Sequence, residues 1–190
     1  MRPQRLTLLA LTALCACASR PAHAPREVFD ERTASTMLVA AEPLVFARDR
    51  FDLAAYAHDY ATLVAIDVDR SGSGSDYLLL YRWSTVDRRM LPPAGADAGT
   101  LRILADGRRI DLAPLERLPV DLTHRRLLHV PNHGDVRPYA YRVDGALLRF
   151  LAQSREITLR MPHEPLDAPF ALSGDGREAL TRFLSHAGTN

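Results

Sequence analysis

The chain has 190 residues, with 24 basic and 23 acidic side chains and a formal net charge of +1. All of the basic residues counted are arginines, which excludes chemistry that needs a lysine, such as Schiff-base formation or a P-loop. The charge balance lacks the basic excess of a nucleic-acid binder, so we expect no nucleic-acid partner. Length and a hydrophobic content of 47% fit one globular domain with appendages.

The N-terminus has the pattern of an export signal. Arg2 and Arg5 give a positive start, and residues 6–16 form an apolar run. This run is shorter than the ~20 residues that a transmembrane helix needs, and it has the length of a secretory signal core. It ends in Leu14-Cys15-Ala16-Cys17, a string that resembles the lipobox of bacterial lipoproteins.

The resemblance implies that residues 1–16 are a signal peptide and that Cys17 becomes the lipid-carrying first residue. Ala18 at the next position then implies sorting to the outer membrane, with the domain facing the periplasm. Ordinary signal peptidase offers two alternatives, cleavage after Ala18 or after Ala24. Residues 17–35 carry prolines and show no sustained hydrophobic period, so we expect a flexible tether there.

The remaining segment, residues 36–190, is predicted to be a single β-rich domain without a cysteine, and therefore without disulfides. Two turn signals predict hairpins: the Gly/Ser-rich residues 70–75 and the pair Asp106-Gly107. The fold class is therefore α+β and β-rich, an antiparallel sheet or sandwich with two short helices, the second at the C-terminus. Strands are expected at 37–40, 44–46, 62–69, 77–83, 100–104, 109–112, 139–143 and 156–161, a helical turn or two at 51–58, and helices at 146–153 and 173–185.

Histidines near the middle of the chain are weak candidates for a metal site. His129 and His133 have a spacing that zinc ligands use on a helix, with His124 and Asp135 nearby. However, Pro131 and Asn132 interrupt the interval and Gly134 follows it, which favours a polar loop. We therefore predict no metal, no other cofactor and no catalytic residue.

Arginine pairs are the second weak candidate, for binding phosphate or acidic glycan through guanidinium groups. Neighbours in a strand point to opposite faces, which weakens the argument. The residues concerned are Arg88, Arg89, Arg108, Arg109, Arg125 and Arg126.

Aromatic residues also share one face of the strand predicted over 77–83. Tyr77, Tyr81 and Trp83 would form a ligand platform if they were exposed, but such a row is more often sheet core.

The leading hypothesis is a non-enzymatic domain that is anchored to the outer membrane by its N-terminal lipid and binds another envelope protein. One alternative is a metal-dependent hydrolase of envelope material that uses His124, His129 and His133. The other is a binder of phosphate-rich or acidic glycan through the arginine pairs.

Overall fold

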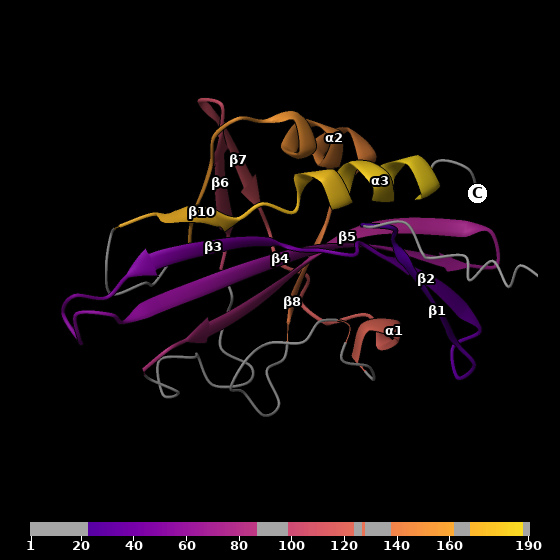
Figure 1. The fold of residues 1–190 in the computed structure, drawn as a ribbon. Coiled ribbons are helices and arrows are strands. Elements are labelled where there is room, and N and C mark those ends of the chain that lie inside the picture. The colour runs from indigo at the N-terminus through magenta and orange to yellow at the C-terminus, as the bar shows by residue number, and fades with distance from the viewer. Residues whose placement is uncertain (1–22, 87–98, 124–126, 128–137, 162–167, 188–190) are drawn as a thin grey trace, which may run out of the picture.

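The computed structural model describes residues 23–86, 99–123, 127, 138–161 and 168–187 (Figure 1). In these residues the chain forms ten strands and three short helices, and every strand pair is antiparallel. This confirms the α+β, β-rich class and adds one helix to the two expected. The elements are β1 (Arg26–Asp30), β2 (Ser35–Val39), β3 (Leu44–Asp49), β4 (His58–Arg70), β5 (Ser73–Ser84), β6 (Leu101–Ala105), β7 (Arg108–Leu112), α1 (Val120–Thr123), β8 (Tyr139–Arg142), α2 (Gly145–Gln153), β9 (Ile157–Arg160), β10 (Phe170–Gly174) and α3 (Arg177–Ala187).

The long β4–β5 hairpin lies at the centre of the sheet. The strands pair from Asp59↔Ser84 to Arg70↔Ser73. Between them, Ser71 and Gly72 take positive φ angles of 56° and 83°, the conformation that a two-residue hairpin turn requires. The first predicted hairpin is therefore confirmed.

Strands β2 and β3 follow each other along the same edge of β4. β2 pairs with the half of β4 that ends at Arg70, and β3 pairs with the half that begins at His58. Pro43 lies in the break between them, as expected from a residue that cannot donate a ladder hydrogen bond. Beyond β2 lies β1, and beyond β3 the order continues β10-β9-β6-β7.

The sheet bends so that its two ends approach each other. β5 pairs with β8 on its second edge. The segment that follows β7 reaches β8, because Leu115 N donates to Ala140 O at 2.8 Å. The β6–β7 hairpin turns at Asp106 and Gly107, with φ angles of 46° and 78°, so the second predicted hairpin is also confirmed.

Several boundaries differ from the sequence-based expectation: β4 begins at His58 rather than at residue 62, β5 begins at Ser73 rather than at residue 77, and two further differences change the element to which a segment belongs. β1 lies inside the segment expected to be a flexible tether up to residue 35, because its register against β2 (Val28↔Met37) provides backbone hydrogen bonds that composition does not reveal. At the other end, the helix expected from residue 173 begins at Arg177. Residues up to Gly174 belong instead to β10, and Gly176 passes so close to Pro43 that a Cβ there would lie 2.4 Å from the Pro43 carbonyl oxygen.

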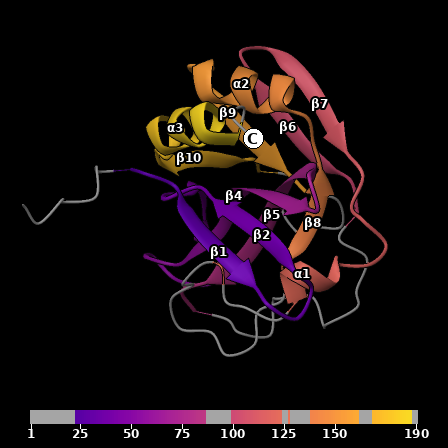
Figure 2. The same cartoon turned by 90° about the vertical axis from the view of Figure 1, so that its right-hand side faces the viewer.

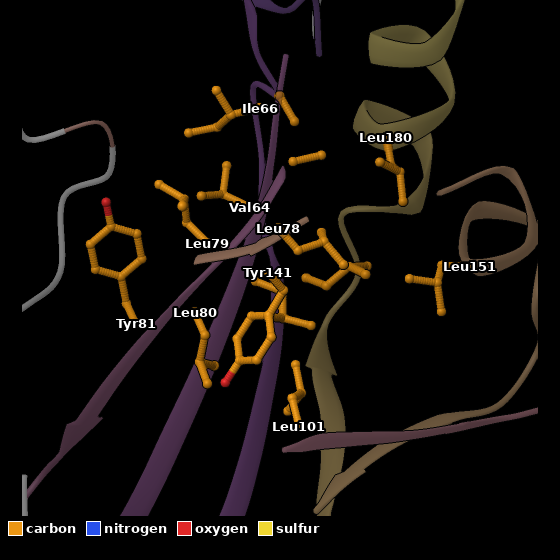
Figure 3. Close-up of a cluster of buried hydrophobic side chains, with 14 of the residues drawn as sticks. Val64, Ile66, Leu78, Leu79, Leu80, Tyr81, Leu101, Tyr141, Leu151 and Leu180 are labelled. Carbon is orange, nitrogen blue, oxygen red and sulfur yellow. The ribbon is translucent and has the colours of Figure 1, made fainter. Parts of the chain in front are cut away.

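The core lies on both faces of the central strands. Figure 3 shows Val64 and Leu79 on one side of the β4–β5 pair, and Leu151 and Leu180 of the helices α2 and α3 on the other. α2 and α3 cover one face of the sheet, and α1 lies on the opposite side (Figure 1). Burial of both faces explains why residues 78–80 are a continuous apolar run rather than an alternating one.

Helix α2 begins where the sequence predicts. Asp144 is its N-cap, and its Oδ1 accepts a hydrogen bond from Leu147 N at 2.7 Å. Leu148 and Leu151 point into the core, and Leu180 and Phe183 of α3 do the same. The described residues contain no helix that is long and apolar enough to span a bilayer.

Two carboxyl groups face each other in the half of the β4–β5 hairpin that is nearer its turn. Asp67 of β4 is directly opposite Asp76 of β5. Burial first, and then the charge of Asp76, raise the pKa of Asp67 above its ordinary value. Burial and the nearby Asp144 likewise raise the pKa of Asp76. The burial and mutual repulsion of these two carboxyl groups therefore oppose folding at neutral pH. The apolar side chains buried along β4 and β5 contribute more free energy to folding than the pair costs.

A buried carboxylate attaches α1 to the sheet. Ser35 Oγ donates to Asp121 Oδ1 at 2.7 Å, and Arg70 Nη2 donates to Asp121 Oδ2 at 2.7 Å. Burial alone would raise the pKa of Asp121, but hydrogen bonds from Ser35, Thr33 and Arg70 outweigh it and lower the pKa to about 2.

Replacing this carboxylate should destabilise the domain in a pH-dependent way. Asp121→Asn is expected to lower the free energy of unfolding at pH 7 by about 2 kcal/mol, since hydrogen bonds to a charged group are lost. Because the folded-state pKa lies below the ordinary value of 3.8, the contribution is complete above that value and disappears as the pH falls towards 2. Urea unfolding at pH 7 and at successively lower pH measures the gap between variant and parent, and a gap that stays constant down to pH 2 would contradict the assignment.

Candidate interaction surface

The loop between β3 and β4, residues 50–57, presents large apolar side chains to solvent. Tyr56 is 88% exposed, Phe51 is 74% exposed and Leu53 is 45% exposed. We call these three residues the β3–β4 tip. Exposing aromatic and aliphatic side chains to water in this way costs free energy, and clusters of them on a protein surface are typical of binding sites.

Backbone hydrogen bonds give this loop a defined shape. Arg50 N donates to Ala57 O at 2.8 Å, which closes the loop at its base. Leu53 N and Ala54 N both donate to Arg50 O, at 2.9 and 3.2 Å, and form a turn. A single turn at the start of residues 51–58 agrees with the sequence-based expectation.

A buried arginine fixes the base of the loop from within. The Arg50 side chain is 3% exposed, and its Nε and Nη2 donate to the two carboxylate oxygens of Asp52 at 2.9 and 2.8 Å. Its Nη1 donates to Asp59 Oδ2 at 2.8 Å, which joins the loop to β4. The hydrogen bond from Arg50 is the largest influence on Asp52 and lowers the pKa of that carboxyl group.

A second arginine completes this charged cluster. Arg48 Nη2 donates to the same Asp59 Oδ2 at 2.8 Å, and its guanidinium carbon lies 4.3 Å from the centre of the Phe170 ring. Burial would raise the pKa of Asp59, but the hydrogen bonds from Arg48 and Arg50 outweigh it and lower the pKa. Asp59 therefore stays ionised, and the loop is attached through ion pairs that are shielded from water.

Carboxylates are the more exposed members of the ion pairs around the tip. Asp49 is paired with His58 at 2.9 Å, and its side chain is more than half exposed. Asp52 is also partly exposed, whereas both arginines of the cluster are buried. The loop therefore exposes to solvent an apolar tip with carboxylates beside it. Its sequence nevertheless contains cations and anions in nearly equal number.

An aromatic pair lies close to the base of the tip. Tyr60 of β4 and Trp83 of β5 are stacked, with ring centres 4.0 Å apart and planes at 9°. Both are half-buried, whereas Tyr81 on the same face of β5 is buried. Of the aromatic row predicted from the sequence, Tyr81 is therefore in the core and Tyr77 packs against it partly buried. Trp83 is partly exposed and stacks on a residue of the neighbouring strand.

Most of the sequence-predicted site residues lie outside the described residues. These are Cys17, His124, His129, His133, Asp135, Arg88, Arg89, Arg125 and Arg126. Within the described residues, no group of three or more histidine, cysteine or acidic side chains is arranged to hold a metal ion.

The described arginine pair does not act as a unit. Arg108 and Arg109 are neighbours in β7 and point to opposite faces. Arg108 lies over the Phe150 ring at 5.1 Å, and Arg109 pairs with Asp111 at 2.7 Å. Neighbouring strand residues that point to opposite faces weaken the hypothesis that adjacent arginines bind phosphate or acidic glycan together, and Arg108 and Arg109 have this arrangement.

Sequence reasoning did not identify the β3–β4 tip. The sequence predicts a helical turn that includes Phe51 and Tyr56 and does not indicate that they are exposed, because apolar residues in a short segment are equally compatible with the core. The usable signal was the alternation of arginine and aspartate over residues 48–52 between two strands, which marks a connection rather than a buried element.

Comparison with known proteins gives no match, whether against protein-family models, curated proteins or solved structures. The surface is therefore interpreted from its own geometry.

Removing Arg50 should destabilise the domain and loosen the tip. Arg50→Met is expected to lower the free energy of unfolding by about 3 kcal/mol, because Asp59 loses one of the cations that compensate its burial. Asp52→Asn should leave global stability nearly unchanged and still increase amide hydrogen exchange over residues 51–57. The matched control is Arg109→Met, which removes an exposed arginine and should change stability by less than ~0.5 kcal/mol. Unchanged amide hydrogen exchange over residues 51–57 in Asp52→Asn would contradict the role of the Arg50–Asp52 ion pair in fixing the loop.

Proposed function

We propose that this protein is a lipid-anchored component of the bacterial outer membrane whose domain faces the periplasm and binds another envelope protein through the β3–β4 tip. The observation that carries the proposal is the exposure of Phe51, Leu53 and Tyr56 on a loop that buried ion pairs hold in one shape. A pre-ordered loop loses little conformational entropy on binding, so its aromatic residues can contribute most of their burial to affinity.

A protein partner fits the tip better than a lipid surface. Asp49 and Asp52 lie beside the apolar side chains, and bilayer phosphates would repel their carboxylates. An apolar pocket with basic residues at its rim would accept both the tip and these charges. The partner surface we propose has this chemistry.

The position of the tip is compatible with an N-terminal anchor. His23 Nδ1 lies 2.9 Å from Glu42 Oε1, so the start of the described chain is beside the β2–β3 break. Strand β3 runs from there to the tip, a span of roughly 20 Å at ~3.3 Å per residue. An anchored domain could therefore hold the tip away from its own point of attachment.

The anchoring part of the proposal predicts a lipidated Cys17. Mass spectrometry of the mature protein should find an N-terminal cysteine with acyl chains, and an inhibitor of lipoprotein signal peptidase should cause the precursor to accumulate. Cys17→Ala should move the protein from the membrane fraction to the soluble periplasmic fraction. A mature protein that begins at residue 19 or 25 would contradict the lipid anchor and support ordinary cleavage.

The binding part predicts a crosslink that depends on the tip. A photoactivatable residue at position 53 should give one discrete adduct in intact cells, and Phe51→Ser with Tyr56→Ser should abolish it because the apolar contact is lost. The control is Phe29→Ser on β1, a residue that is also exposed, at 56%, but distant in the sheet order. An adduct that survives the tip substitutions, or is lost equally with Phe29→Ser, would contradict the assignment of the tip.

A further inference from the structure

A second surface of the domain gathers arginine side chains from three neighbouring strands. Arg102 of β6, Arg109 of β7 and Arg160 of β9 all point outward and are exposed. We call these residues the three-arginine face. Strand β7 pairs only with β6 among the described strands, so the face extends to an edge of the sheet (Figure 2).

The register places two of these cations directly opposite each other. Arg102 pairs with Arg160 across β6 and β9, and like charges in this position destabilise a sheet. Asp111 is the one acidic residue in the described sequences of these three strands, and its carboxylate lies on the same face. Asp111 accepts from Arg102 Nε at 3.0 Å and from Arg109 Nη2 at 2.7 Å.

Asp106, at the turn between β6 and β7, is an acidic residue at the border of the face. The carboxylate of Asp106 accepts hydrogen bonds from the backbone N–H groups of Arg155 and Glu156, at 2.9 to 3.1 Å. These backbone contacts lower the pKa of Asp106 and orient it along the backbone. Arg155 and Glu156, both exposed, offset each other at the same end.

An apolar side chain lies among the guanidinium groups. Leu104 of β6 is 47% exposed and is opposite Arg109 on one side and Thr158 on the other. Guanidinium groups bind phosphate through paired hydrogen bonds, and an apolar residue between them can enter the boundary between headgroups and acyl chains. Free phosphate would gain nothing from Leu104, because it has no apolar part that could contact this side chain.

We infer that the three-arginine face binds the phosphate headgroups of an anionic lipid bilayer, with Leu104 entering the interface between them. The inference goes beyond the proposed function, because it requires neither a lipid on Cys17 nor a partner at the β3–β4 tip. In a chain that is anchored, even a weak contact of this kind would be occupied, since the anchor keeps the face at high local concentration near the bilayer.

Vesicle co-sedimentation of the full chain tests the inference. Vesicles of phosphatidylethanolamine and phosphatidylglycerol should bind the parent chain more tightly than vesicles of phosphatidylcholine, and added salt should weaken that binding. Arg102→Gln, Arg109→Gln and Arg160→Gln together should lower the partition coefficient roughly a hundredfold, about fivefold for each guanidinium. The hydrophobic N-terminal run is present in every chain compared, so it does not contribute to the difference.

Two single variants sharpen the test. Asp111→Asn should strengthen vesicle binding, because it removes the carboxylate that competes for Arg102 and Arg109. Leu104→Ser should weaken binding several-fold and leave its salt dependence unchanged. All of these side chains are exposed, so circular dichroism should show an intact fold.

The matched control replaces three exposed arginines elsewhere, Arg32, Arg117 and Arg142, with glutamine. Equal losses in the control and in the face variant would overturn the inference in favour of non-specific charge attraction. Unchanged binding by the face variant would overturn it directly. Inorganic phosphate that displaces the chain from vesicles better than chloride at the same ionic strength would assign the face to free phosphate instead.

Discussion

The β4–β5 ladder is the constraint on which the rest of the domain depends. Twelve of the thirteen residues of β4 pair with β5, the other edge of β4 pairs with β2 and β3, and most β4 side chains are buried. Burying a large aliphatic side chain contributes about 1.5–3 kcal/mol to folding. The buried side chains of β4 and β5 therefore offset unfavourable interactions at other sites of the domain, such as exposed apolar residues. Charged residues on the two strands are accordingly found towards their ends.

Buried carboxyl groups at the two ends of the β4–β5 ladder have pKa values shifted in opposite directions. At one end Asp59 accepts from two arginines, which lowers its pKa and fixes the loop that follows β3. At the other end Asp67 faces another carboxylate, which together with burial raises its pKa. The first arrangement stabilises a defined loop with exposed aromatic side chains, whereas the second costs stability. The proposed binding surface is at the end where charge is compensated.

The two proposed surfaces belong to separate strands. The β3–β4 tip continues from β3 and β4, and the three-arginine face lies on β6, β7 and β9, with β10 between β3 and β9 in the sheet. Their chemistry also differs, since the tip is apolar with acidic neighbours and the face is cationic. Contact of the face with a bilayer is therefore compatible with binding of a protein at the tip, provided that both proposals hold.

Local signals in the sequence determined the hairpin turns, the α2 cap and most strands, because turn geometry and alternation depend only on neighbouring residues. Only the tertiary structure decided that β1 joins the sheet, that Arg48 and Arg50 are buried, and that Arg102 meets Arg160. Each of these depends on the register between segments distant in the chain, and register is set by packing of the whole sheet. Turn signals and alternation therefore determined the α+β, β-rich fold class, while the surfaces that can bind a partner were decided by which side chains the fold left outside.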